Sequence, residues 1–187
     1  PEDHPLALGA GIHLPAVADL VAQADVVVAI GTELAPSDLW NGPLPISSPL
    51  VRVDVDPVAV VTNVVPDVAL VGDAGPTLEE LLAALGPTSS VDPQAARETA
   101  ETLAAWRARK TSDATAEGAE WLDIVTALAD ALPGDAIVAA DSAMVCYYGA
   151  IANLPVQQPS SFLYPVGFGT LGYGLPAAVG AKTAHPD

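Results

Sequence analysis

The sequence predicts an α/β fold made of two incomplete parallel-sheet units joined by a linker. Short β-branched runs alternate with stretches of helical apolar spacing on both sides of a segment rich in Pro and Ser, and this alternation is typical of βαβ units. Hydrophobic residues make up 51% of the 187 residues, which is enough for a buried core. Neither half contains the roughly five or six strands of an ordinary sheet, so we expect both units to be incomplete.

The first half opens with a helix and two strands. Residues 16–24 carry apolar side chains at helical spacing, and a β-branched run at 26–30 ends at Gly31, which predicts a helix followed by a buried strand. A proline-rich loop comes next. Residues 50–56 then alternate between apolar and polar side chains until Pro57, and this alternation predicts a second strand.

A third strand and a helix complete the first half. Residues 68–71 form the strand, and Gly86 is a natural end for the helix after it. Thr77 with Glu80 three residues later predicts the start of this helix, because the two side chains can satisfy its first amides reciprocally. Four leucines form its apolar stripe, namely Leu78, Leu81, Leu82 and Leu85.

A linker separates the halves. Residues 86–93 contain two prolines and no apolar pattern. Asp92 suits the N-cap and Pro93 the first position of a polar helix that we expect to end near Lys110. Residues 111–119 are small and polar, and no helix is expected there.

The second half repeats the α/β alternation. Apolar spacing predicts a helix over 121–132, and the β-rich run at 136–140 predicts a strand. Residues 141–153 favour a helix, 162–166 favour a short strand, and 175–182 favour a last helix.

Charge and composition exclude several classes of partner. Six basic against 23 acidic residues give a net charge of -17, which repels a phosphate backbone. No apolar run approaches the roughly 20 residues of a membrane span, and no leader opens the chain. We therefore expect no nucleic acid and no membrane partner. The single cysteine, Cys146, excludes an intramolecular disulfide and favours a cytoplasmic protein. Because the chain opens on Pro1, we expect a piece of a longer protein.

The segment Gly167–Gly174 spells a G-x-G-x-x-G pattern between a predicted strand and a predicted helix. In a dinucleotide-binding fold, such glycines let a pyrophosphate reach a helix N-terminus. A tight turn with close helix packing would need the same residues. The acidic residue that would decide between these alternatives falls beyond Asp187.

The wider stretch 167–182, GFGTLGYGLPAAVGAK, resembles the thiamine-diphosphate-binding domain of the acetolactate synthase-like family. Further segments resemble that family's central domain in the same order along the chain, namely Pro1–Leu6, Ala24–Thr32, Val53–Pro57 and Asp67–Asp73. The resemblance covers nearly the whole chain and is weakest between about 87 and 118.

The resemblance implies an enzyme of three α/β domains. Residues 1–86 would be the C-terminal part of the Rossmann-like central domain, 87–118 a linker with a polar helix, and 119–187 the start of the diphosphate-binding domain. The family's activating glutamate lies in the N-terminal domain of a neighbouring subunit, so no catalytic residue is expected in this chain. The acidic and amide ligands of Mg²⁺ are expected beyond Asp187, and we assign no metal ligand here.

The resemblance also implies an activity. Family members use thiamine diphosphate and Mg²⁺ to decarboxylate a small 2-oxo acid, and they release an aldehyde or ligate the resulting enamine to an acceptor. A homodimer or homotetramer is expected for the full-length protein. Two alternatives remain open from the residues alone: a non-catalytic nucleotide-binding module, and an NAD-type oxidoreductase fragment.

Five residues are the candidates for cofactor binding by this resemblance. Leu171 would be the aliphatic wedge beneath a bent thiamine diphosphate, Gly169 would offer its carbonyl to the cofactor's amino group, and Gly167 would allow close approach of the main chain. Asp141 and Ser142 occupy the turn where the family places diphosphate contacts, although capping of a helix would also explain them.

This turn departs from the family pattern. Many acetolactate synthases have Gly-Gln-His where the present chain has residues 143–145, Ala-Met-Val. The usual Gln and His contacts are therefore absent, and the Ser142 hydroxyl with local backbone amides would have to replace them. The departure argues against a standard acetolactate synthase.

Binding of FAD to the central domain is doubtful. FAD-binding relatives often have an arginine after Gly-Thr, where this chain has Glu33, and a carboxylate there would repel a diphosphate. Asp54 and Asp56 at a predicted strand end suit either ribose hydroxyls or simple exposure to solvent.

Overall fold

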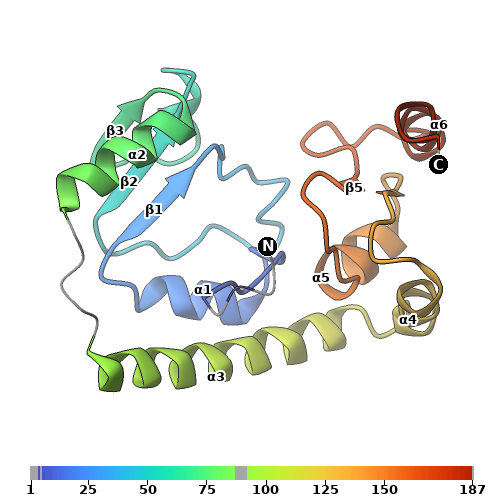
Figure 1. Cartoon of the computed structure of the whole chain (residues 1–187), viewed down its shortest axis with the longest axis horizontal. Coiled ribbons are helices and arrows are strands. Elements are labelled where there is room, and N and C mark those ends of the chain that lie inside the picture. The colour runs from blue at the N-terminus through green and yellow to red at the C-terminus, as the bar shows by residue number, and fades with distance from the viewer. Residues whose placement is uncertain (1–3, 5, 87–91, 187) are drawn as a thin grey trace. The chain divides into compact units, whose positions relative to one another are not determined.

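The computed structural model describes residues 4, 6–86 and 92–186 and confirms the α/β class. It contains a three-stranded sheet of order β1-β2-β3 and a two-stranded sheet of β4 and β5, with every pair parallel (Figure 1). The chain divides into two compact units. The central unit comprises residues 15–102, and the C-terminal unit comprises the described residues up to Leu14 together with those from Leu103 onward.

The central unit follows the order expected from the sequence. Its elements are α1 (Pro15–Ala22), β1 (Val27–Ile30), β2 (Leu50–Asp54), the short 3-10 helix η1 (Ala59–Val61), β3 (Val68–Val71) and α2 (Ala74–Leu85).

Strand β2 is the middle strand of the sheet. Val51 is in register with Val28 of β1 and Val68 of β3. On the opposite face, Ala29 and Leu50 pack with Leu34 and Leu39 from the long loop after β1. The loop thus closes a small hydrophobic core over one face of the sheet.

The predicted start of α2 was wrong. Asp73 is the N-cap, and its carboxylate accepts a hydrogen bond from the Gly75 amide at 2.9 Å. Thr77 lies inside the helix, and its amide already bonds to the Asp73 carbonyl. Asp is as good an N-cap as Thr and comes first along the chain, so the helix begins one turn earlier than the Thr77–Glu80 pattern indicated.

The guanidinium of Arg52 clamps the carboxyl edge of this sheet. Arg52 is 1% exposed, and its two terminal nitrogens donate to four backbone carbonyls at 2.5–3.1 Å. These carbonyls belong to Thr32, Ala59, Thr62 and Val64. One side chain therefore fastens the turn after β1 to the segment that follows β2, in a planar geometry that Lys cannot reproduce.

The C-terminal unit contains short strands and several helices. After α3 (Pro93–Glu117), which begins in the central unit, come α4 (Leu122–Ala131), β4 (Val138–Ala139), the π-helix η2 (Val145–Ala150), α5 (Ile151–Asn153), β5 (Phe162–Leu163) and α6 (Gly174–Ala184).

Helix α3 is longer than the sequence predicted, because it runs on through 111–117. Tertiary contacts explain the extension. Ala114 is buried, and its carbonyl accepts hydrogen bonds from the Gly118 amide and the Asn153 side chain. A Cβ at Gly118 would lie 2.7 Å from the Tyr148 carbonyl oxygen. Packing against the helix after β4 therefore stabilises a polar segment that has little apolar pattern of its own.

The N-terminal segment packs against the last turns of α3. The buried His13 ring bonds through Nε2 to Glu117 Oε2 at 2.8 Å, and Arg107 Nε donates to the Ala7 carbonyl at 2.8 Å. Burial lowers the pKa of His13, although the Glu117 carboxylate opposes this shift. These contacts explain why the first described residues group with the C-terminal unit.

The helix expected over 141–153 forms as a π-helix that continues into α5. Gly149 allows η2 to approach α4 closely, because a Cβ there would lie 2.8 Å from Trp121 Cβ. Val125 of α4 packs with Ala150 and Leu154 in the core of this unit.

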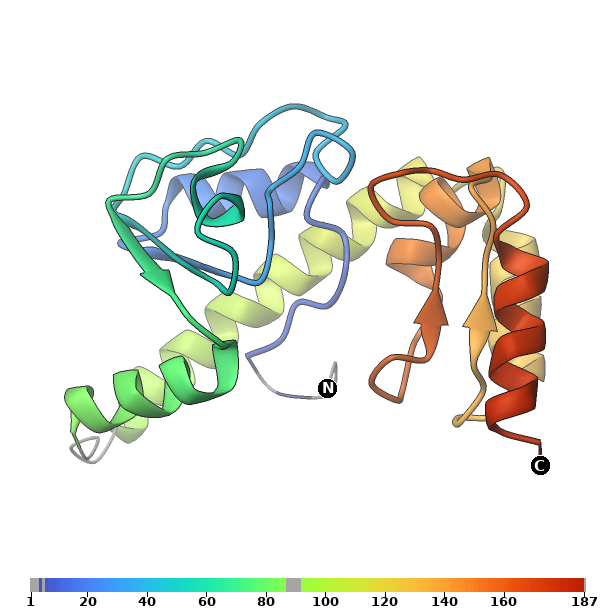
Figure 2. The same ribbon diagram turned by 90° about the horizontal axis from the view of Figure 1, so that it is seen from above.

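Strands β4 and β5 lie side by side and parallel, with α6 alongside β4 (Figure 2). Strand β5 ends at Leu163, before the predicted end at 166. Pro165 has no amide that could donate a hydrogen bond to a neighbouring strand. Within the described ranges, none of the helices is both long and apolar enough to cross a membrane.

We expect Arg52→Met to lower the free energy of unfolding by about 3 kcal/mol or more, because four carbonyls lose a charged donor at once. Urea denaturation of the full-length protein measures the loss. Arg97→Met, on an exposed position of α3, is the matched control and should change stability by less than about 0.5 kcal/mol. Equal effects of the two substitutions would show that the clamp does not stabilise the central unit.

Candidate functional site

Two turns meet at the carboxyl ends of β4 and β5. One turn connects β4 to η2, and the other connects β5 to α6 and passes over the end of β4 (Figure 2). The carboxylate of Asp141, in the first turn, accepts hydrogen bonds from the Gly172 amide at 2.9 Å and the Gly174 amide at 3.2 Å in the second. It also accepts from the Ser142 amide at 2.8 Å. Asp141 therefore ties the two turns together.

These amides lower the pKa of Asp141. The largest cause is the bond from Gly174; desolvation opposes it, and the amides of Gly172, Ser142 and Tyr173 reinforce it. Hydrogen bonds from several backbone N–H groups favour the charged form of a carboxyl group. At neutral pH the turn is thus held by a carboxylate whose charge is directed at backbone dipoles.

The glycines of the second turn hold conformations or close contacts that a residue with a side chain would disfavour. Gly167, Gly169 and Gly172 have positive φ values of 77°, 64° and 81°, a region that L-residues with a Cβ rarely adopt. Gly174 allows α6 to start against the end of β4, because a Cβ there would lie 3.1 Å from the Asp141 amide nitrogen.

The surroundings of these glycines are open. A Cβ at Gly169 would point toward two hydroxyls, with Ser142 Oγ at 3.6 Å and Tyr147 Oη at 3.9 Å. A Cβ at Gly167 or Gly172 would meet no atom within 4 Å. A flat or chain-like group can therefore approach the main chain here without displacing a side chain.

The apolar side chains of this turn are not buried by the described residues. Leu171 is 78% exposed and Phe168 is 94% exposed. A branched leucine held between positive-φ Gly169 and Gly172 presents rigid apolar bulk to whatever occupies the space.

The structure brings together most of the residues selected from the sequence. Asp141, Ser142 and Gly169 lie within one cluster, while Gly167 and Leu171 belong to the same glycine turn. Sequence analysis missed the part played by Tyr147, whose hydroxyl lies 2.6 Å from Ser142 Oγ. Ser142 precedes the helix, and the Tyr147 amide bonds to the Ala143 carbonyl at 3.1 Å, so the tight turn into the helix brings the two hydroxyls together.

Cys146 does not contribute to the site. The side chain is buried, and burial together with the charge of Asp141 raises the pKa of its thiol to about 11. Because the thiolate is the reactive form, this cysteine is unreactive at neutral pH, and packing is its role.

The acidic residues at the carboxyl edge of the central sheet are engaged in local turns. Asp54 Oδ1 accepts from the Asp56 amide at 2.9 Å, and Asp56 Oδ1 accepts from the Val58 amide at 2.7 Å. Both carboxylates are thus used to shape the segment that leads into η1. This geometry favours their interpretation as turn residues over a role as ribose ligands.

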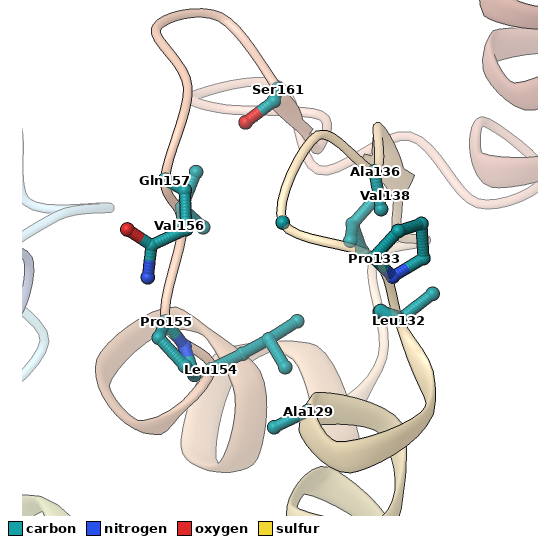
Figure 3. A pocket seen from close by; sticks show the side chains of 11 residues that line it. Ala129, Leu132, Pro133, Ala136, Val138, Leu154, Pro155, Val156, Gln157 and Ser161 are labelled. Atoms are coloured by element: carbon teal, nitrogen blue, oxygen red, sulfur yellow. The ribbon is translucent and has the colours of Figure 1, made fainter.

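A small pocket of about 110 Å³ lies at the other end of the two-stranded sheet (Figure 3). Its walls come from the end of α4 and from the segments that precede β4 and β5, and the side chains in Figure 3 are mostly aliphatic. Ser161 on its wall already donates to the Gln158 carbonyl at 2.7 Å. The pocket holds no convergent set of polar groups, so the carboxyl-end turns remain the candidate site.

Comparison with known proteins identifies the class of fold and site. The family model described as the central domain of thiamine pyrophosphate enzymes matches residues 1–81, and the model described as the C-terminal TPP binding domain of these enzymes matches residues 143–187. The second match contains the whole glycine turn and the π-helix.

Individual relatives support the same family assignment as the two family models. A probable 2-ketoarginine decarboxylase, AruI, from Pseudomonas aeruginosa is 42% identical over 100% of this chain and 33% of its own length. The acetolactate synthase isozyme 3 large subunit of Escherichia coli is 31% identical with the same coverage. The structure of a putative thiamin diphosphate-dependent enzyme from Mycobacterium smegmatis superposes with a TM-score of 0.61 at 24% identity, covering 100% of this chain and 35% of that one.

The chain belongs to the thiamine pyrophosphate enzymes, as the resemblance in the sequence indicated. It spans about a third of the length of the curated relatives it matches.

Asp141→Asn should loosen the glycine turn. The amide keeps one acceptor oxygen, but it removes the charge and places an NH₂ group against a backbone N–H. We expect amide exchange in a peptide covering 167–174 to accelerate several-fold, because the Gly172 and Gly174 amides lose a charged acceptor. Hydrogen exchange followed by mass spectrometry measures it. Asp135→Asn, at an exposed position before β4, is the control and should leave this peptide unchanged.

The hydrogen bonds between the Asp141 carboxylate and the glycine turn should persist in mild acid. The pKa of Asp141 is lowered from an ordinary value of 3.8, so its stabilising contribution is complete above that value and is lost as the pH falls through the lower, folded-state pKa. Exchange of the 167–174 peptide, corrected for its intrinsic pH dependence, should stay constant from pH 7 to about pH 4 and rise only below. A loss of protection centred above pH 4 would contradict the assigned hydrogen bonds.

Proposed function

We propose that the full-length protein containing this chain binds thiamine diphosphate with Mg²⁺ and decarboxylates a small 2-oxo acid. The observation that carries the proposal is the glycine turn that Asp141 holds over the carboxyl ends of β4 and β5, with open space in front of it. This turn falls inside the segment matched by the TPP-binding domain.

Each candidate residue has a separate task. Leu171 supports the bend of the cofactor, Gly169 offers its carbonyl to the cofactor's amino group, and Gly167 leaves room for the main chain to approach. Ser142 donates its hydroxyl to the diphosphate. Asp141 accepts hydrogen bonds from the Gly172 and Gly174 amides, and through them it positions the neighbouring Leu171.

When bound, thiamine diphosphate would supply the electron sink for decarboxylation of the 2-oxo acid. The residues of this chain bind, bend and shield it. We place the Mg²⁺ ligands and the activating glutamate in segments outside residues 1–187, and we infer a homodimer or homotetramer in the cytoplasm.

The domain ranges 1–86, 87–118 and 119–187 are retained as part of the proposal. The two matched segments support them, because one ends at residue 81 and the other begins at residue 143. FAD is not expected in the central domain, since Glu33 would place a carboxylate near its diphosphate.

The product is an aldehyde in this proposal. The relative named as a 2-ketoarginine decarboxylase is 42% identical, against 31% for the acetolactate synthase, and Ala143–Val145 departs from the Gly-Gln-His of many acetolactate synthases. These two observations favour release of an aldehyde after decarboxylation over ligation to a second 2-oxo acid. The match to a TPP-binding domain also favours thiamine diphosphate over the dinucleotide that the glycine pattern alone allowed.

Leu171→Ala tests this proposal in the full-length protein. Removing the support beneath the bend should lower the rate of 2-oxo acid decarboxylation by about tenfold to a hundredfold, because small errors in the placement of reacting groups are costly. Stability should hardly change, since Leu171 is 78% exposed. Coupled detection of the aldehyde, with saturating thiamine diphosphate and Mg²⁺, measures the rate.

Leu175→Ala is the matched control, because Leu175 is 77% exposed on α6 and has no assigned role. Its rate should equal that of the unsubstituted protein. Wild-type rates in the Leu171 variant would refute the wedge, and absence of magnesium-dependent thiamine diphosphate binding in the unsubstituted protein would refute the proposed function as a whole.

A further inference from the structure

Exposed valines follow one another along the segment after β2. Val58 and Val61 lie on the same side of the 3-10 helix η1, because residues three apart coincide in this kind of helix. Val60, between them, is buried. Val55 and Val65 flank the pair along the chain, and all four outward valines are between 45% and 80% exposed. We call these four residues the valine face.

Hydrogen bonds hold the valine face in one conformation. Asp56 Oδ1 accepts from the Val58 amide at 2.7 Å, and Thr62 Oγ1 donates to the Val58 carbonyl at 2.8 Å. The buried guanidinium of Arg52 donates to the carbonyls of Ala59 and Thr62. A surface that is already ordered loses little conformational entropy when it binds a partner. The valines are therefore presented on a fixed support.

Folding of the central unit does not explain these side chains, because aliphatic groups that stay in water contribute little to stability. A single exposed valine is ordinary on a protein surface. Several exposed aliphatic residues on one ordered segment are typical of a contact surface.

Carboxylates border the valine face. Asp54 and Asp56 stand on either side of Val55, and Asp67 comes two residues after Val65. The exposed residue Glu33 belongs to the loop that the Asn63 side chain binds, through a 3.0 Å hydrogen bond to the Glu33 carbonyl. The border of the face is thus negatively charged.

The central unit has little positive charge to offset this border. Residues 15–102 include thirteen acidic residues but only two basic ones, Arg52 and Arg97, and Arg52 is buried. A second copy of the chain would bring the same carboxylates to the contact, and an anionic membrane would also be repelled. Charge complementarity therefore favours a basic protein partner.

We propose that the valine face is a docking surface for a protein segment that presents aliphatic side chains next to Lys or Arg. The valines supply the apolar centre of the contact, and the bordering carboxylates select the charge of the partner. This inference is independent of the cofactor and the reaction proposed above.

Fluorescence anisotropy with the full-length protein tests the docking surface. The probe is a labelled peptide of alternating Lys and Leu. A second peptide has Ser in place of Leu, and a third has Glu in place of Lys. We expect the Lys–Leu peptide to bind about tenfold or more tightly than either of the others. Its affinity should fall several-fold when NaCl is raised from about 0.05 M to about 0.3 M.

Val58→Ser combined with Val61→Ser should abolish the preference for the Lys–Leu peptide over the Lys–Ser peptide. Leu82→Ser combined with Leu85→Ser is the matched control, because it removes a pair of exposed aliphatic side chains from α2 in the same acidic unit. This control should keep the preference.

Two further measurements on the valine variant distinguish other occupants of the face. Its Tm should stay within about 2 °C of that of the unsubstituted protein, and its molar mass by light scattering should be unchanged. A larger fall in Tm would show that another segment of the same protein covers the face, and a lower mass would show that a second copy covers it. Either result would overturn the inference, as would equal binding of the three peptides or a Leu preference that survives the loss of both valines.

Discussion

The carboxylate of Asp141 holds the candidate site in shape, because it joins two turns that are far apart in sequence. Its bonds to the amides of Gly172 and Gly174 span more than thirty residues, and the two-stranded sheet beneath them has only two paired positions. So short a sheet gives little cooperative stability to the loops above it. The geometry around Leu171 therefore depends on one charged group that is satisfied by backbone dipoles.

In the central unit, too, a charged side chain holds loops by bonding to backbone groups, but there the charge is positive. There the buried guanidinium of Arg52 binds four backbone carbonyls at the carboxyl edge of its sheet. In both units the charged side chain is bonded to main-chain groups, and these hydrogen bonds offset the desolvation of the charge. Loop conformations at the strand ends are thereby fixed, and these ends are where α/β proteins place their ligands.

Periodicity and turn chemistry predicted the fold class, the five strands found among the described residues and most helices, because these signals are local. One error has a local cause and the other a non-local one. Asp73 caps α2 ahead of the Thr77 pattern, and Ala114 extends α3 by packing with residues near 150. Within the site, the glycine pattern and Asp141 were visible in the sequence. The Ser142–Tyr147 pair was not, since Ser142 precedes the helix and no helical spacing rule relates its side chain to that of Tyr147.

A structure of the full-length protein with thiamine diphosphate and Mg²⁺ tests the central claim most directly. We predict the cofactor against the main chain of Gly169 and the side chain of Leu171, with the Asp141 carboxylate still bonded to the amides of Gly172 and Gly174. An Asp141 side chain turned away to ligate the metal ion, or a cofactor remote from the glycine turn, would contradict the account.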